Sequence, residues 1–210
     1  MADIKWLGHA CFRVKTRDAT VLMDPTSREQ GVNLTRQRAD LVTLSRKGGD
    51  GGALAMLEGE YTVVDGPGEY EVQDIFVTGI RTGGADEARG IKVFNTVYLV
   101  EIDDLILCHL GDLHNTLSPA QVEALGEMDV LFVPIGPDGG LTTAQATEVI
   151  GQVTPKMVIP MRYRMGDERG QQALRELVTA LGFSDVPHGT SIVLRKNNLT
   201  DRMSMTILVV

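Results

Sequence analysis

The residues that most often bind transition metals are few and widely spaced in this chain. Its 210 residues include two cysteines, Cys11 and Cys108, and four histidines, His9, His109, His114 and His188. Zinc sites need three or four ligands, mainly His and Cys supplemented by carboxylates, and the ligands commonly follow short spacings such as CxxC. Neither HxH nor CxxC occurs in this sequence. We therefore expect no tightly bound zinc.

A glycine-rich loop is the first candidate for a functional site. The apolar run ADLVTL (39–44) leads directly into SRKGGDGG (45–52). A buried strand that ends in a polar, glycine-rich loop is typical of a site. Such loops can cradle phosphate, but the spacing here matches neither GxxxxGK[ST] nor GxGxxG. The loop therefore predicts a site without naming its ligand.

The surrounding elements follow from periodicity and turn residues. Short apolar or alternating runs predict strands at 4–8, 11–15, 20–24, 39–44, 61–64, 75–80, 93–102, 105–110, 129–135, 156–161, 191–196 and 204–210. Helical periodicity and capping residues predict helices at 53–59, 118–127, 141–153 and 167–182. We expect a hairpin turn at Asp103–Asp104 and a polar loop at 81–90. Strands first and alternating helices later predict two packed sheets with helices outside, in one domain spanning 1–210.

Composition limits the classes of partner. Hydrophobic residues make up 43% of the chain and charged residues 23%, which is ordinary for a soluble globular protein. The formal net charge of -8 argues against binding to nucleic acid or to an anionic membrane. The polar start of the chain does not resemble a signal peptide, and we find no apolar run long enough to span a membrane. Two reduced, buried thiols and a cytoplasmic location are expected, and a homo-oligomer is compatible with these data.

Four segments resemble landmarks of the metallo-β-lactamase superfamily, and most closely its small stand-alone branch of Zn-dependent hydrolases. They are WLGHACFRV with TVLMDP near the start, ADLVTLSRKGGD, the long segment from NTVYLV to FVPIG, and VIPMRY. The resemblance extends from about residue 3 to residue 165. It implies an α/β fold, a four-layer αββα sandwich.

The resemblance also implies where metal ligands would lie, and most of those positions have changed. With Ser45 aligned, the histidines of the family's HxHxDH loop fall on Arg46, Gly48 and Gly51. A later histidine falls in the range 82–85, which reads TGGA, and the last one falls on Arg162. Two acidic residues remain as vestigial ligand positions, namely Asp50 and Asp112.

The residues at these positions allow more than one interpretation. Asp50 and Asp112 are either weak ligands of zinc or of another divalent metal, hydrogen-bond acceptors, or an acid/base pair. Arg46 and Arg162 either replace the charge of zinc by pairing with a carboxylate, or point into solvent. We expect at least one Arg–Asp pair across the former metal site, because a buried carboxylate without a partner is costly.

Two histidines complete the candidate pocket. The resemblance places His9 at the pocket border, where a hydrogen-bonded structural role is favoured over that of a catalytic base. His114 is a candidate to face the cleft. The predicted pocket therefore comprises His9, Arg46, Asp50, Asp112, His114 and Arg162, and none of them is assigned a catalytic role.

Two functions compete at this point. The first is a protein that has lost most zinc ligands, carries no cofactor, and binds a small molecule or an anion or serves a structural role. The alternative is a metal-dependent hydrolase that acts on a phosphoester, lactone or similar bond with residual or altered activity. Fold alone does not decide between an enzyme and a binding protein.

Overall fold

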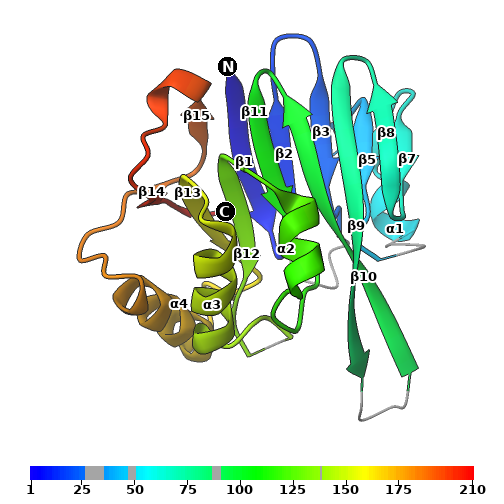
Figure 1. The fold of residues 1–210 in the computed structure, drawn as a ribbon. Coiled ribbons are helices and arrows are strands. Elements are labelled where there is room, and N and C mark those ends of the chain that lie inside the picture. The colour runs from blue at the N-terminus through cyan, green and yellow to red at the C-terminus, as the bar shows by residue number, and fades with distance from the viewer. Residues whose placement is uncertain (27–35, 47–50, 87–90, 138) are drawn as a thin grey trace.

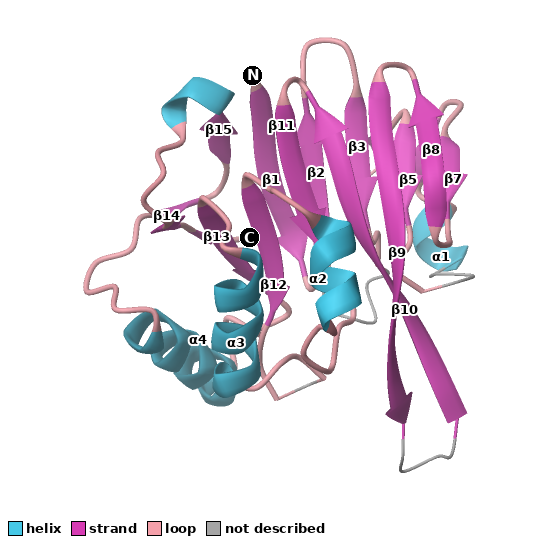
Figure 2. Ribbon diagram, in the orientation of Figure 1, coloured by secondary structure: helices cyan, strands magenta, loops and turns pink. Residues whose placement is uncertain are grey.

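Two β-sheets lie face to face and form the centre of the molecule (Figure 1, Figure 2). The structure is a computed structural model that describes residues 1–26, 36–46, 51–86, 91–137 and 139–210. The first sheet has the strand order β15-β1-β2-β3-β5-β7 and the second has the order β16-β13-β12-β11-β10-β9-β8.

The strands of the first sheet are β1 (Ala2–Gly8), β2 (Cys11–Lys15), β3 (Thr20–Met23), β5 (Leu41–Thr43), β7 (Thr62–Val64) and β15 (Ile192–Leu194). Those of the second are β8 (Gly68–Val72), β9 (Ile75–Asp86), β10 (Ile91–Ile102), β11 (Leu105–His109), β12 (Val130–Pro134), β13 (Met157–Met161) and β16 (Ser204–Met205). Two small sheets pair β4 (Gln37–Arg38) with β6 (Leu57–Glu58) and β14 (His188–Gly189) with β17 (Ile207–Leu208). The helices are α1 (Gly51–Leu54), α2 (Pro119–Leu125), α3 (Thr143–Val153), α4 (Glu168–Ala180) and the 3-10 helix η2 (Lys196–Asn198).

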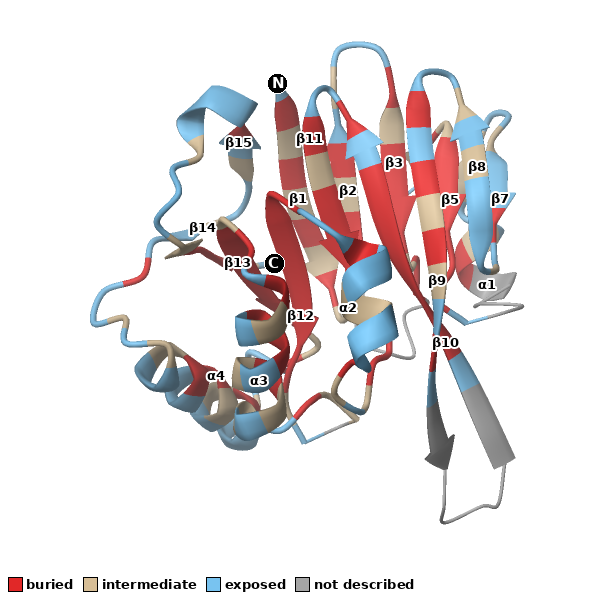
Figure 3. Ribbon diagram, viewed as in Figure 1, coloured by how far each residue is buried: buried red, intermediate tan, exposed pale blue. Residues whose placement is uncertain are grey.

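Burial along the strands shows the layer to which each belongs. Strand β1 alternates between buried and half-buried positions, as expected for a strand with one face on the core. Strands β12 and β13 are buried at every position, because the first sheet covers one face and helices cover the other (Figure 3). The expected αββα sandwich is confirmed, with α2, α3 and α4 outside the second sheet and the four-residue α1 outside the first (Figure 1).

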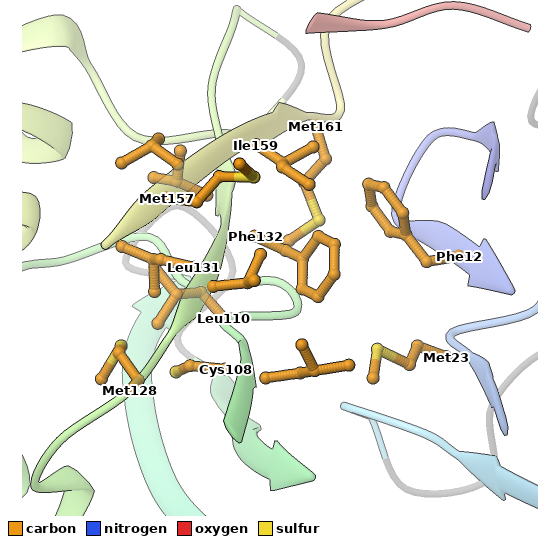
Figure 4. Packing of buried hydrophobic residues seen from close by; sticks show 14 of the residues in the cluster. Phe12, Met23, Cys108, Leu110, Met128, Leu131, Phe132, Met157, Ile159 and Met161 are labelled. Atoms are coloured by element: carbon orange, nitrogen blue, oxygen red, sulfur yellow. The ribbon is translucent and has the colours of Figure 1, made fainter. Parts of the chain in front are cut away.

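Aromatic and methionine side chains fill the space between the sheets. Phe12 and Met23 of the first sheet point towards Phe132 and Met161 of the second (Figure 4). The ring centroids of Phe12 and Phe132 are 4.4 Å apart. Each such side chain, once fully buried, contributes about 1.5–3 kcal/mol of transfer free energy, so this interface holds the two sheets together.

The direction of the strands determines where loops gather. In the first sheet β1 and β3 both run antiparallel to β2, and β3 pairs in parallel with β5. In the second sheet β11, β12 and β13 are parallel neighbours. The loops after β1, β3, β5, β11, β12 and β13 therefore leave from C-terminal strand ends, which meet at one edge of the sandwich (Figure 1). In α/β proteins such an edge is the usual place for a site.

The predicted polar loop at 81–90 was wrong in its first part. Strand β9 continues to Asp86 and pairs with β10, with Asp86 opposite Ile91, and residues 87–90 lie outside the described residues. Pairing to a long partner strand overrides the polar, glycine-rich composition. The resulting hairpin extends past the sheet edge (Figure 1).

Most other expected elements agree with the structure. The predicted strand 204–210 is divided into β16 and β17, which lie in different sheets, and the predicted strand 191–196 ends with β15 before η2. The predicted helix 53–59 is shorter and earlier, since α1 covers Gly51–Leu54 and β6 follows it. The predicted helix 118–127 is α2, and Ser118 and Gln121 form a capping box at its start. The turn residues Asp103 and Asp104 have φ angles of 53° and 65°, which suits a tight hairpin.

Two further expectations concern the thiols and the membrane. Cys11 and Cys108 are buried free thiols, and burial raises the pKa of each above its ordinary value. Their thiolate forms are therefore scarce at neutral pH. Within the described ranges, no helix has both the length and the apolar character needed to cross a membrane.

A buried ion cluster fixes the opposite edge of the second sheet. The Asp129 carboxylate, 1% exposed, lies 3.0 Å from Lys156 Nζ and 2.6 Å from Lys196 Nζ. Its Oδ2 also accepts a hydrogen bond of 2.9 Å from the Ile106 N–H. Burial by itself would raise the pKa of Asp129, but hydrogen bonds from Lys196, Ile106 and Lys156 hold it below its ordinary value. The cluster ties together the beginnings of β11, β12 and β13.

Replacing this carboxylate will reduce stability in a pH-dependent way. Asp129→Asn is expected to lower the free energy of unfolding by about 2–3 kcal/mol at pH 7, the usual size of a hydrogen-bond loss at a charged group. Because the folded pKa is depressed, the contribution is complete above the unfolded pKa of about 4 and is lost as pH falls through the folded pKa. Urea unfolding at pH 7 and pH 3 measures the difference. The exposed Asp185→Asn is the control, and a pH-independent loss in Asp129→Asn would contradict the assignment.

Candidate functional site

The Asp112 carboxylate is the centre of the site at the C-terminal strand edge. Asp112 follows β11, and its side chain is 5% exposed. Its Oδ1 faces Nη1 of Arg162 and its Oδ2 faces Nη2 of Arg46, both in ion-pair contact. His114 Nε2 lies 3.4 Å from the same Oδ2. Four of the predicted pocket residues thus meet around one buried carboxylate.

The two arginines differ in their exposure. The side chain of Arg162 is 9% exposed, whereas that of Arg46 is 56% exposed. The expected Arg–Asp pairing is therefore present twice, once in the interior and once at the surface. A guanidinium stays protonated in either environment, so both carry a full positive charge next to Asp112.

Backbone hydrogen bonds hold the segments that carry these side chains. The His9 carbonyl accepts 2.9 Å hydrogen bonds from the Arg162 N–H and from Trp6 Nε1, which joins the β1–β2 turn to the end of β13. Asp24, after β3, accepts a 2.6 Å hydrogen bond at Oδ1 from the Ser45 N–H. This bond positions the start of the Arg46 segment.

Asn95 in β10 positions Asp112 itself and was not among the residues predicted from the sequence. Its Oδ1 accepts a 2.8 Å hydrogen bond from the Asp112 N–H, and its Nδ2 donates to the Leu110 carbonyl at 3.0 Å. The same Nδ2 donates to Thr82 Oγ1 at 2.9 Å. Asn95 is 4% exposed. An asparagine in the middle of a predicted strand was the available signal.

A loop after β12, which includes Gly136 and Gly139, packs against His114 and Arg162. A Cβ atom on Gly139 would lie 3.2 Å from His114 Cε1 and 3.4 Å from Arg162 Nη2. Gln145 Nε2 donates a 3.3 Å hydrogen bond to the His114 carbonyl. The loop and α3 therefore hold His114 and Arg162 in place, which leaves Arg46 on the more open side.

Several residues at this edge have left-handed backbone. Positive φ angles occur at the site in His9 (53°), Asp24 (42°), Arg162 (67°), Gly8 (108°), Gly111 (60°), Gly136 (110°) and Gly139 (88°). For non-glycine residues this region is strained, and such strain persists where the surroundings fix it, often at functional sites. These residues lie at the ends of five strands, β1, β3, β11, β12 and β13, which meet at this edge.

His109 and His188 contact other parts of the structure. His109 is fully buried and donates from Nε2 to the Ala10 carbonyl at 2.9 Å, and its Nδ1 lies 3.8 Å from Asp24 Oδ2. Burial lowers the pKa of His109, which keeps the ring neutral despite the nearby carboxylate. His188 is exposed in β14. His9 reaches the site through its carbonyl, and Asp50 lies outside the described residues.

The described side chains do not fit a zinc ion. Within the described part of the chain, no three His, Cys, Asp or Glu side chains gather as a metal-binding group. Asp112 and His114 are adjacent, but both oxygens of Asp112 face arginine guanidinium groups. A metal cation at this carboxylate would meet two fixed positive charges. The donor set and the local charge both disagree with the zinc site that the resemblance implies.

Comparison with known proteins identifies the family. The model of the β-lactamase superfamily domain matches residues 3–162. The chain belongs to this superfamily. The resemblance found in the sequence is therefore confirmed, and the two packed sheets are its fold.

Relatives match most of the chain. A UPF0173 protein from Pyrococcus furiosus is 28% identical over 176 residues, which cover 76% of this chain and 82% of the relative. A UPF0173 metal-dependent hydrolase from Hyperthermus butylicus is 25% identical over 198 residues, covering 78% and 84%. A crystal structure from Thermotoga maritima, described as a candidate Zn-dependent hydrolase of the metallo-β-lactamase superfamily, has 28% identity and a TM-score of 0.81, covering 99% of this chain and 98% of that chain.

Gly111 is expected to be intolerant of any side chain. A Cβ there would lie 2.0 Å from Ser45 Oγ and 2.7 Å from Asn95 Oδ1, and φ is 60°. Left-handed strain and overpacking together predict a loss of about 2–5 kcal/mol for Gly111→Ala. Gly182→Ala is the matched control, with φ of 77° and no neighbour within 4 Å, and should lose only about 1–2 kcal/mol. Equal losses in chemical denaturation would mean that the packing around Gly111 is not limiting.

The shared carboxylate predicts two unequal couplings. Arg162→Ala is expected to cost about 3–5 kcal/mol, because it removes a buried partner, and Arg46→Ala about 0–1 kcal/mol, because Arg46 is half exposed. Double-mutant cycles of each arginine with Asp112→Ala, followed by denaturant unfolding, measure the couplings. The Arg162–Asp112 coupling should be the larger. Strict additivity in both cycles would show that neither pair stabilises the fold.

Proposed function

We propose that this protein binds a small ligand at a metal-independent arginine–aspartate centre and does not act as a zinc hydrolase. The observation that carries the proposal is the Asp112 carboxylate with one guanidinium at each oxygen. In this arrangement arginine provides the compensating positive charge that a metal ion would otherwise provide.

Three features support a binding site over a purely structural ion pair. The cluster lies at the C-terminal strand edge, where α/β folds bind ligands. Its backbone includes non-glycine residues at positive φ, of which Arg162 at 67° carries a pairing side chain. Arg46 keeps more than half of its side-chain surface exposed, so the centre is accessible from solvent.

A metal-dependent hydrolase is the second candidate, and the relatives favour it. Several of them, including the one from Methanopyrus kandleri at 24% identity, carry the name metal-dependent hydrolase. For this chain the hypothesis requires a metal at Asp112, with Asp50 as a further carboxylate and with both arginines withdrawn. Hydrolysis of a phosphoester or lactone, stimulated by an added divalent metal and lost in Asp112→Asn, would establish it.

Metal content separates the two candidates. Untagged protein purified from zinc-supplemented cells should contain well under one zinc per chain, and titration with ZnCl₂ should show no tight site, since the described donors are too few. Elemental analysis and calorimetry measure these quantities. Asp112→Asn and Asp129→Asn should match the parent protein. One or two tightly held ions, lost in Asp112→Asn and retained in Asp129→Asn, would overturn the proposal in favour of the hydrolase.

A further inference from the structure

We propose that the free edge of β8 binds an extended, basic segment of a partner protein as an additional strand of the second sheet. In this segment lysine or arginine alternates with apolar residues. The surface that it contacts, called here the β8 edge surface, comprises the β8 backbone with the side chains of Glu69, Glu71, Phe76 and Glu101. It shares no residue with the Asp112 centre, so the inference goes beyond the proposed function and does not depend on it.

The backbone of β8 provides the hydrogen-bonding groups. Within the described part of the chain, β8 is the last strand of the second sheet and pairs with β9 alone (Figure 1). The two-residue turn between them has φ angles of 49° and 53°, which is typical of a hairpin whose flanking pair, here Val72 and Ile75, is hydrogen-bonded. Hydrogen-bonded and non-hydrogen-bonded pairs alternate along an antiparallel ladder. The N–H and C=O groups of Glu69 and Glu71 therefore point away from β9, towards the open edge.

The side chains on the outer face add an exposed aromatic ring between carboxylates. Phe76 lies directly opposite Glu71 on β8 and Glu101 on β10, so these three side chains share one face of the sheet. Phe76 is 49% exposed. An added strand would place every second side chain on this face, next to Glu69 and Glu71. A lysine or arginine there can lay its apolar stem along the surface and direct its charge to a carboxylate.

The charge of this region selects a basic partner. Residues 51–80 contain no lysine, arginine or histidine, and six acidic residues: Glu58, Glu60, Asp65, Glu69, Glu71 and Asp74. Among these six, only Glu58 has an ion-pair partner in the described part of the chain, Arg36 at 2.9 Å. Opposite charges in cross-strand positions stabilise a strand pair, whereas like charges destabilise it. A basic segment is therefore favoured over an acidic one, and charge complementarity also speeds its association.

The same charge argues against a second copy of this chain as the occupant. Pairing of two β8 edges would bring Glu69 and Glu71 of both copies next to one another, which is unfavourable. Each copy also has a formal net charge of -8. Charged side chains on an edge strand are a common means of preventing self-pairing. Here the carboxylates that oppose self-pairing are the groups that a basic strand would contact.

The test is an NMR titration of the full ¹⁵N-labelled chain with a synthetic hexapeptide of alternating lysine and valine, blocked at both ends. This peptide should give saturable shifts at the backbone amides of Glu69 and Glu71 and should slow their hydrogen exchange. A second peptide with glutamate in place of lysine should not bind. A third, with the lysines kept and proline in place of the middle valine, should bind at least about tenfold more weakly, because proline removes a ladder hydrogen bond and disfavours the extended pairing.

Variants of the protein separate the contribution of charge from that of the backbone. Glu71→Gln should weaken binding of the lysine–valine peptide about two- to fivefold, the usual effect of an exposed ion pair. Glu71→Pro also removes an N–H that points away from β9, and it should weaken binding at least about tenfold while the β8–β9 bonds remain. The control is Glu148→Gln, which removes an exposed carboxylate of α3 and should leave binding unchanged.

Several results would overturn the inference. They are shifts that do not saturate or that map away from β8, equal affinity for the lysine and glutamate peptides, and equal weakening in Glu71→Gln and Glu148→Gln. A concentration-dependent dimer that is lost in Glu71→Pro would assign the edge to a second copy instead. Circular dichroism checks that each variant is folded, and Glu71→Gln decides the outcome where Glu71→Pro is not.

Discussion

The buried Asp112 carboxylate is the constraint on which the site depends. Moving a carboxylate out of water costs several kcal/mol unless opposite charge and hydrogen bonds replace its hydration. Here the replacement comes from Arg46 on the first sheet and Arg162 on the second. Because Asp112 pairs with an arginine from each sheet, it holds the segments after β5, β11 and β13 together. The charge of a metal is one way to meet this requirement, and paired guanidinium groups are another.

The fold brings the charged residues of both sheets to one edge of the sandwich. Parallel neighbours β11, β12 and β13 release their loops at one edge, and β1, β3 and β5 do the same from the facing sheet. Asn95 holds the Asp112 backbone from within β10, and Asp24 holds that of Ser45. The core aromatics between the sheets provide the rigid support that permits Arg162 to occupy the left-handed region. Packing in the interior therefore offsets the free energy of the backbone strain at the edge.

Sequence reasoning predicted the elements with clear periodicity and the residues at positions where the resemblance implied ligands. Strand β2 and the cap of α2 were identified from local signals alone. Arg46, Asp112 and Arg162 were identified because each replaces or retains an expected ligand. Their pairing was predictable from the cost of an isolated buried carboxylate, whereas their unequal exposure depends on how the loops pack and has no local signature.

What the sequence did not reveal depends on contacts between distant segments. Asn95 lies in the middle of a predicted strand, and its role requires knowing that β10 continues past the end of its neighbour β11. Gly139 looks like an ordinary turn glycine until His114 and Arg162 are placed next to it. The continuation of β9 to Asp86 arises from its partner strand and not from its own residues. The interpretation of Asp50 as a vestigial ligand position remains a prediction, because it lies outside the described residues.

A comparison within the same sheet separates stability from function. Asp129 is also buried between two cations, but it lies at the N-terminal strand edge, next to Val130 of β12. Its partners are lysines, point charges that need no planar alignment, and left-handed residues lie near this edge too, at Asp103, Asp104 and Thr154. At the Asp112 edge the partners are arginines with a fixed fork, and strained residues surround them. A buried ion pair alone accounts for Asp129. The Asp112 edge differs in the planar forks of its two arginines, one buried and one half exposed, and the proposed binding site depends on this difference.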